Sequence, residues 1–432
     1  MKQLTNRRLI CASVTAILIA TSSAALGQSS VQPVSDLTAP EVMTGFPPAA
    51  DKVISRANIL KPQNSRWAFR RLREIYSTRA VARPDLPKKL PAKPRDLSAV
   101  KFTTTGGDTL TVAEWQKRTG TDALVVLRNG QIEYESYAPG MSGRTQHALW
   151  SMSKSMVGLM AMIAIEEGRL DPQRLVTEYL PELKGSGWDG ATVEHVLDMR
   201  VGVAYRETFS DPTADIFRYL FAGGLLVPPP GLPVSKNLYE YLATVKAGAD
   251  HGGPFEYKSV DTEVVSWILQ RVYDRRLADI MSEKIWTKIG AQDEAYYIVD
   301  PYGIDIGSVG LAASALDLAR LGQSLSDSVS RSGTLVGKAS LQALQDGKTR
   351  DAFAKSAQAT VRTGYSYRNQ WWMPNDTDGT LEAKGLFGQH LVINPNKNVV
   401  IVKLSTNPSG DTISTHAMDT AAFTAIVKHS NK

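Results

Sequence analysis

A hydroxyl and an amine lie three residues apart in the tetrapeptide Ser151-Met152-Ser153-Lys154. Positions i and i+3 of a helix share one face, so a helix beginning here would bring the Ser151 hydroxyl within hydrogen-bond reach of the Lys154 amine. Such a pair is a nucleophile with an adjacent base, the arrangement that acyl transfer requires. The free N–H groups at the helix N-terminus would also favour a developing oxyanion.

The residues after Lys154 favour such a helix. The run 156–165 is almost entirely apolar, and Gly168, followed by Asp171-Pro172, is typical of a helix C-terminus. We therefore predict a buried helix over 151–168, with the serine at its N-terminal end.

The same spacing occurs a second time, at Ser98 and Lys101. A Pro-rich stretch precedes Ser98 and three threonines follow Phe102, so no helix is expected to bring that pair together. Taken alone, the spacing is more often a small residue at a helix start plus a lysine from a polar stripe than a catalytic pair. The context assigns the chemistry to Ser151.

Length and composition indicate an ordinary globular protein. The chain has 432 residues, 43% of them apolar, enough to bury one large core or two medium ones. The formal net charge is +6, and much of the basic excess falls in 66–73 and 83–95. We interpret these segments as a solvated linker and expect no nucleic-acid partner, because nucleic-acid binding needs a basic face with groove-reading or aromatic elements.

The first 27 residues have the pattern of a secretory signal peptide. Lys2, Arg7 and Arg8 precede an apolar run over 9–20, and small residues follow. This run is far shorter than the ~20 residues of a spanning helix. We expect a cleaved leader, no stable membrane insertion and a periplasmic or secreted protein. The only cysteine, Cys11, lies in the leader, so the mature chain would hold no disulfide.

The distribution of proline and of periodic segments predicts three parts: the signal peptide 1–27, a Pro-rich N-terminal arm 28–100 and a main domain 101–432. Predicted strands are 123–127, 131–134, 365–373, 381–384, 389–394 and 398–405. Predicted helices are 66–75, 151–168, 192–198, 237–245, 259–273, 278–288, 314–325 and 414–427. Strands at both ends of the main domain predict an α+β fold, with one antiparallel sheet built from both chain ends, flanking helices, and a mainly helical lobe at about 170–310.

Other catalytic motifs are missing or incomplete. The chain has no Gly-x-Ser-x-Gly and no His-Glu-x-x-His, and its six histidines are scattered. The run 185–190 spells a dinucleotide-binding fingerprint but does not join a strand to a helix, so we interpret it as a loop. The run 333–338 is one residue short of a phosphate loop. We expect no metal and no organic cofactor.

Three stretches carry a family resemblance. Leu149 to Gly158 resembles the active-site helix of the serine β-lactamase and penicillin-recognising superfamily, particularly its class C and esterase-like branch. Leu197 to Gly202 is similar to the loop after the family's second helix. Gly307 to Gly322 resembles its G-L-x-x-x-A-x-D-L-A-R helix.

The N-terminal arm resembles one group of enzymes within this superfamily. Residues 45–48 and 64–69 are similar to 6-aminohexanoate-dimer hydrolases, so the likeness covers about 45–428. It implies a β-lactamase/transpeptidase-like fold and an acyl-enzyme on Ser151.

The resemblance implies a catalytic tyrosine in a Tyr-x-Asn or Tyr-x-Ser motif. We assign Tyr257 of Tyr257-Lys258-Ser259, because it opens a predicted helix in the helical lobe. Tyr134 and Tyr367 match the spelling too but lie in predicted strands. Free tyrosine and lysine have pKa values near 10 and 10.4, too high for efficient base work at neutral pH. Whether Lys154 or Tyr257 takes the Ser151 proton stays open.

The resemblance also implies an oxyanion hole formed by the backbone N–H groups of Ser151 and Leu386. The predicted substrate-binding residues are Phe209, Ser259, Gly385 and Gln389.

Two departures from the relatives bear on the substrate. Penicillin-active members carry a Lys-Thr-Gly-like triplet, whereas this chain has Ala383-Lys384-Gly385. The lysine that binds a lactam carboxylate is then missing. Phe209 stands where the nylon-oligomer enzymes carry a tyrosine that helps to bind the scissile amide, so ester cleavage is expected to exceed amide cleavage.

Together these features predict an exported serine hydrolase that cleaves amide or ester bonds of small molecules. A β-lactamase or D-alanyl-D-alanine carboxypeptidase-like enzyme is the first alternative, and a non-catalytic envelope binding protein is the second. The natural substrate and the oligomeric state are not readable from the sequence.

Overall fold

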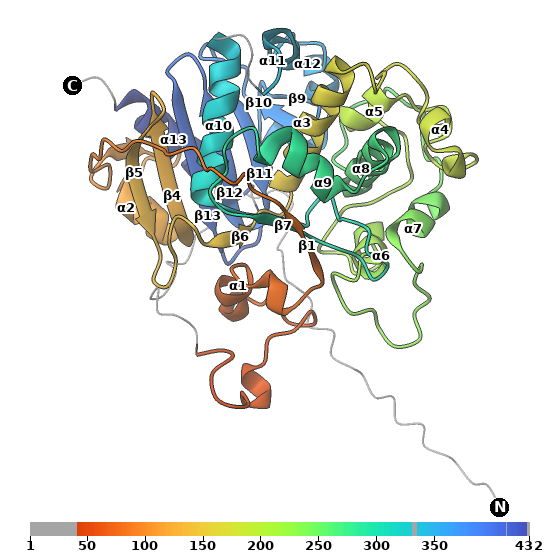
Figure 1. Cartoon of the computed structure of the whole chain (residues 1–432), viewed down its shortest axis with the longest axis horizontal. Helices are drawn as coiled ribbons and strands as arrows, with labels where there is room; N and C mark the ends of the chain where they lie inside the picture. The colour runs from red at the N-terminus through yellow and green to blue at the C-terminus, as the bar shows by residue number, and fades with distance from the viewer. Residues whose placement is uncertain (1–40, 331–334, 412, 430–432) are drawn as a thin grey trace, which may run out of the picture.

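The computed structural model describes residues 41–330, 335–411 and 413–429 (Figure 1). The predicted leader, 1–27, lies outside these residues. No helix among the described residues is both long enough and apolar enough to span a bilayer.

The main sheet is built from both ends of the main domain, as predicted. It has seven strands in the order β5-β4-β13-β12-β11-β10-β9, with antiparallel neighbours throughout. Its strands are β4 (Thr121–Arg128), β5 (Gln131–Tyr137), β9 (Ser366–Arg368), β10 (Trp371–Met373), β11 (Leu381–Gly385), β12 (Gln389–Asn394) and β13 (Val399–Ser405). The central pairing, Val125 opposite Val402, joins two segments far apart in the sequence.

Helices cover both faces of this sheet (Figure 1). Successive side chains of a strand point to opposite faces, so Val125 and Leu127 lie in one core while Leu124 and Val126 lie in the other. The first core is covered by α3 (Met152–Glu166) and α10 (Ala315–Ser330), and the second by α2 (Val112–Arg118) and α13 (His416–Lys428). The α+β fold class is confirmed.

The helical lobe lies on the other side of α3 (Figure 1). It contains α4 (Val176–Tyr179), α5 (Val193–Leu197), α6 (Asp215–Ala222), α7 (Leu238–Thr244), α8 (Ser259–Tyr273) and α9 (Leu277–Met281), which runs into a π-helical turn, Ser282–Trp286. Two short helices, α11 (Lys338–Leu344) and α12 (Arg350–Ala354), then lead back to the sheet. Residues 185–190 form turns, in agreement with the predicted loop.

A second sheet, which the sequence did not predict, includes part of the N-terminal arm. Its order is β1-β7-β8-β6, with β1 (Thr78–Val81), β6 (Gln146–Ala148), β7 (Ala295–Ile298) and β8 (Leu311–Ser314). A separate small hairpin pairs β2 (Lys101–Thr103) with β3 (Thr109–Thr111). These strands are only three or four residues long, too short for a clear alternation of apolar and polar residues.

The arm packs against the main domain, and its basic residues are not simply a solvated linker. In place of one helix over 66–75 it has α1 (Pro62–Ala68) and a 3₁₀ turn at Leu72–Glu74. The fully buried Asp122 on β4 forms an ion pair with Arg66, whose Nε lies 2.9 Å from the carboxylate, and a second ion pair with Arg70. These arginines therefore fasten the arm to the main sheet.

The predicted strand 365–373 is a hairpin, β9 and β10. Its turn residues Asn369 and Gln370 have φ values of 45° and 66°. The turn fits against α3, where a Cβ added to Gly158 would lie 2.0 Å from the Asn369 carbonyl oxygen. The Ser155 hydroxyl donates to the Gln370 carbonyl oxygen at 2.7 Å. Close packing of backbone on backbone thus requires glycine in the middle of an otherwise strong helix.

Candidate active site

The N-terminal end of α3 places Ser151 and Lys154 as the motif predicts. Ser151 occupies the N-cap position, and the Lys154 Nζ lies 3.0 Å from the Ser151 Oγ. Lys154 is almost completely buried, whereas Ser151 is half-buried and reachable. The hydroxyl is therefore partly exposed, whereas the amine that it contacts is shielded from water.

The buried Glu263 carboxylate orders the loop that accepts a second hydrogen bond from the Lys154 amine. The Nζ donates to the Ser308 carbonyl oxygen at 3.2 Å. The Glu263 carboxylate accepts from the backbone N–H groups of Gly307 and Ser308 at 3.0 and 2.9 Å. The Tyr219 hydroxyl donates to Glu263 at 2.8 Å and lies 2.7 Å from the Ser308 Oγ. Glu263 and Tyr219 thus hold the loop that supplies the lysine's acceptor.

Tyr257, the third residue predicted to be catalytic, lies in the segment immediately before α8. Its hydroxyl is close enough to the Ser151 side chain for the serine hydroxyl to act against the rise in the Tyr257 pKa, and the Lys154 Nζ lies 5.0 Å from the Tyr257 ring centroid. The ring stacks on Trp372 at a centroid distance of 5.7 Å and an interplanar angle of 27°. The structure therefore brings together all three residues predicted to be catalytic.

The competing tyrosines make other contacts, although the Tyr367 ring packs edge-on against Tyr257 at 6.2 Å. Tyr367 is fully buried in the β9–β10 hairpin, with its hydroxyl 3.5 Å from the Gln370 Oε1. Tyr134 lies on β5, where its hydroxyl is 3.4 Å from Gln116 on α2. Neither hydroxyl has a described bond to the nucleophile.

The sequence did not single out Glu207, which lies next to the constellation. It accepts from the Ser259 backbone N–H at 2.6 Å and from the Ser259 hydroxyl at 2.8 Å. Ser259 is itself almost fully buried. Since its hydroxyl donates a hydrogen bond to Glu207, we revise the predicted role of Ser259 from substrate binding to positioning of the segment that carries Tyr257.

Burial sets the proton affinities of the central groups. It lowers the pKa of Lys154 to about 8, because the ammonium loses hydration, while the carboxylates Glu207 and Glu263 act in the opposite direction. Burial also raises the pKa of Tyr257 well above its usual value, and Glu207 adds to that shift. The site therefore favours a neutral phenol beside an amine that can lose its proton near neutral pH.

The end of β11 approaches the Ser151 turn closely. A Cβ added to Gly385 would lie 2.2 Å from the Leu149 carbonyl oxygen and 3.1 Å from the Met152 nitrogen. Only glycine allows this approach, which puts the following residue, Leu386, beside the nucleophile. A direct contact of Gly385 with a substrate and the oxyanion role of Leu386 stay predictions.

Gln389 has a different role from the one predicted. Its side chain is fully buried, and its Nε2 donates to the carbonyl oxygens of Leu386 and Ser405 at 3.1 and 2.6 Å. The Ser405 N–H donates to its Oε1 at 3.0 Å. The buried amide makes these three hydrogen bonds within the chain, so we revise Gln389 to a residue that fixes the Leu386 turn.

Phe209 lies in the loop before α6. Its half-buried ring contacts Phe217 edge-on at 6.3 Å. Contact with a substrate stays a prediction for this residue.

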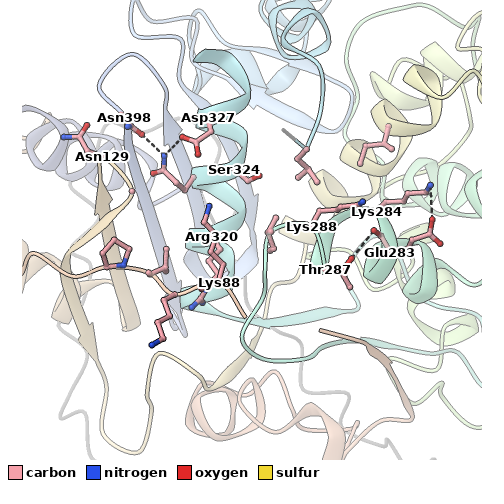
Figure 2. Close-up of a pocket in the computed structure, with 18 of the residues that line it drawn as sticks. Lys88, Asn129, Glu283, Lys284, Thr287, Lys288, Arg320, Ser324, Asp327 and Asn398 are labelled. Atoms are coloured by element: carbon pink, nitrogen blue, oxygen red, sulfur yellow. Dashed lines mark hydrogen bonds and ion pairs between the residues drawn. The ribbon is translucent and has the colours of Figure 1, made fainter. Parts of the chain in front are cut away.

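A cavity of about 790 Å³ lies on another part of the surface, between α10 and the turn after α9 (Figure 2). Its walls are charged, and part of this charge is paired: the Lys284 Nζ pairs with Glu167 at 2.9 Å and with Glu283 at 3.1 Å. None of the residues predicted to be catalytic lines it. We therefore locate the chemistry by the contacts of Ser151 rather than by cavity size. Among the described residues, no group of three or more His, Asp or Glu side chains is arranged to hold a metal ion.

Comparison with known proteins identifies the family. The β-lactamase family model matches residues 106–422. The chain belongs to the β-lactamase family. Over 356 residues it is 34% identical to the 6-aminohexanoate-dimer hydrolase of Paenarthrobacter ureafaciens, covering 82% of this chain and 88% of that protein.

Solved structures extend the comparison. A protein from Bacillus anthracis assigned as a 6-aminohexanoate-dimer hydrolase superposes with a TM-score of 0.80 and 27% identity, over 88% of this chain and 98% of that one. The penicillin-binding protein homologue of Pyrococcus abyssi matches with a TM-score of 0.56 and 18% identity, over 72% of this chain and 75% of that one, and shows the shared fold. Family membership and the homologous hydrolases make this protein a serine hydrolase.

Substitution of Tyr257 by phenylalanine tests the choice of tyrosine. Tyr257→Phe removes the hydroxyl assigned as the general acid beside Ser151, so kcat for hydrolysis of a p-nitrophenyl ester should fall at least about a hundredfold, in the range typical of a lost general acid or base. Tyr367→Phe is the matched control and should leave kcat within about threefold of wild type. The opposite order of effects would show that the wrong tyrosine has been assigned.

Proposed function

We propose that this protein is an exported hydrolase that cleaves amide or ester bonds of small molecules through an acyl-enzyme on Ser151. The observation that carries the proposal is the 3.0 Å contact between the Ser151 hydroxyl and the buried Lys154 amine, with the Tyr257 ring 5.0 Å from the same amine. The 34% identity to a 6-aminohexanoate-dimer hydrolase supports this substrate class.

Acylation begins when the Ser151 Oγ attacks the substrate carbonyl carbon. The neutral Lys154 amine takes the hydroxyl proton, a role for which its lowered pKa of about 8 suits it. The N–H groups of Ser151 and Leu386 are the proposed donors to the oxyanion. The neutral phenol of Tyr257 protonates the leaving alcohol or amine, and the Lys154 ammonium returns a proton to the phenolate.

Deacylation repeats the sequence with water. Lys154 accepts a proton from the water molecule that attacks the acyl carbonyl, and the collapse of the tetrahedral intermediate releases the acid. Ser151 regains its proton, so the enzyme ends the cycle unchanged. Every proton transfer uses side chains of this chain.

The end of β11 favours this substrate class over penicillins. Ala383 points to the core that contains α3, whereas Glu382 and Lys384 point to the opposite face. The Lys384 Nζ is buried there, 2.5 Å from the Glu382 carboxylate. Lys384 pairs with Glu382 on that face and is not placed like the first residue of the penicillin-type triplet. This end of β11 therefore has no lysine positioned to bind a lactam carboxylate.

Intact-mass spectrometry of the acyl-enzyme tests the proposed function. Brief exposure to a p-nitrophenyl acyl ester should add one acyl group to wild type, with release of p-nitrophenol and turnover. Ser151→Ala should show neither. Ser98→Ala, the serine of the second Ser-x-x-Lys, is the matched control and should behave like wild type.

Parallel exposures to the 6-aminohexanoate dimer and to a penicillin separate the alternatives. Hydrolysis of the dimer or the ester without a lasting penicillin adduct supports the proposal. A long-lived penicillin adduct on Ser151 would assign the protein to the penicillin-binding enzymes. A protein that shows no acylation and no turnover on any of these compounds would be a binding protein.

The pH dependence of kcat/KM tests the assignment of the base. Lys154 must be neutral to accept a proton, so kcat/KM should rise with pH and level off above about 8. Glu207→Gln removes a carboxylate that raises the pKa of Lys154, so the rising limb should move to lower pH. Glu256→Gln, at an exposed carboxylate, is the control and should leave the limb in place. A rate that falls over the same range would exclude neutral lysine as the base.

Export is proposed from the leader pattern of residues 1–27. Expression of the full chain in a Gram-negative host should yield a periplasmic protein whose N-terminus lies near residues 26–28, as read by mass spectrometry. Replacing Leu18 by Arg breaks the apolar run and should leave an uncleaved chain in the cytoplasm. An unprocessed cytoplasmic wild type would contradict export.

A further inference from the structure

Two aromatic residues with left-handed backbone conformation flank the two proposed oxyanion donors. Trp150, with φ of 48°, immediately precedes Ser151, and Phe387, with φ of 63°, immediately follows Leu386. Bulky residues rarely adopt such conformations, which cost about 1–3 kcal/mol each and persist only where the surroundings hold them. Both turns that present an oxyanion donor therefore depend on external support.

The two aromatic side chains share one support, the ring of Phe69 in the N-terminal arm. The Phe69 ring contacts Trp150 at 5.0 Å and Phe387 at 4.8 Å, both edge-on, and the latter two rings lie 5.7 Å apart. Phe69 is fully buried. Within the described part of the chain the Trp150 indole Nε1 has no hydrogen-bond partner, so packing holds this side chain.

The backbone of Phe69 reinforces the contact. Its carbonyl oxygen accepts from the Ala148 N–H at 2.8 Å, two residues before Trp150. The ion pairs of Arg66 and Arg70 with the buried Asp122 fasten the same short segment to the main sheet. The residues on either side of Phe69 are thus fixed by ion pairs, so its ring has a fixed position against Trp150 and Phe387.

We propose that Phe69 is a positioning residue for the oxyanion hole: one ring wedged against Trp150 and Phe387 sets the spacing between the Ser151 and Leu386 N–H groups. The inference rests on the proposed function. It places a requirement for activity outside residues 106–422, the part that the family model matches. The arm is then a component of the active site rather than only an attachment to it.

The test is Phe69→Leu, with Phe423→Leu as the matched control. Phe423 is also a buried phenylalanine, but it packs against Trp115 and His390 on the other face of the sheet. Steady-state kinetics with a p-nitrophenyl ester, thermal unfolding, and inhibition by phenylboronic acid, which forms a tetrahedral adduct with an active-site serine, are measured on both. Phe69→Met is made in parallel, because a flexible side chain can fill the space if leucine does not allow folding.

For Phe69→Leu we expect kcat to fall at least about tenfold with KM within about threefold, because a misplaced oxyanion donor affects the transition state more than the bound substrate. Binding of phenylboronic acid should weaken in proportion. Phe423→Leu should lose similar thermal stability yet keep its kcat.

Either Phe69 variant, folded and with wild-type kcat and boronic-acid affinity, would overturn the inference. Equal kinetic losses in Phe423→Leu would also overturn it, since the effect would then be one of general stability. A wild-type protein without Ser151-dependent acylation would instead remove the proposed function itself.

Discussion

The structure depends on holding an amine in a dry interior next to a serine hydroxyl. Burying an ammonium is unfavourable unless other groups replace its hydration, and in this protein nearby carboxylates compensate only part of the lost hydration. Burial lowers the pKa of Lys154, while Glu207 and Glu263 limit the shift. Each carboxylate is engaged by other groups, Glu207 by Ser259 and Glu263 by Tyr219. The lysine can therefore hold or release a proton near neutral pH without losing its place.

This requirement explains why α3 is buried nearly all round. Its N-terminal half meets the end of β11 at Gly385, where a Cβ would lie 3.1 Å from the Met152 nitrogen, and the loop at Gly307, where a Cβ would lie 3.2 Å from the Val157 side chain. Further along, Gly158 fits against the Asn369 turn. Glycines at such close contacts let the main sheet and the helical lobe pack on one helix, α3, which lies between them (Figure 1).

The parts of the fold with strong local signals could be predicted from sequence. The helix after Ser151, α8 over Ser259–Tyr273, and the pair β4 and β5 around the Asn129-Gly130 turn are long and periodic. The four-stranded sheet was missed, because its strands are three or four residues long.

The site was predictable only where one motif carries the chemistry. Ser151 and Lys154 lie on one helical turn, and Tyr257 was found through resemblance. Glu207 and Glu263 were missed because a buried carboxylate becomes recognisable only with its partners, which lie 52 and 44 residues away in sequence. The amide of Gln389 was assigned to the wrong role because the sequence does not show which face of a turn it occupies.

The pairing of β1 with β7 has a consequence for the boundaries of the folding unit. Thr78–Val81 forms the outer strand of the second sheet and covers one edge of Ala295–Ile298, whose side chains are all buried. Without the arm, that edge would present unpaired backbone N–H and C=O groups beside an apolar row, a template for pairing with another chain. A chain cut at the start of the main domain would then tend toward aggregation rather than form a smaller folded protein.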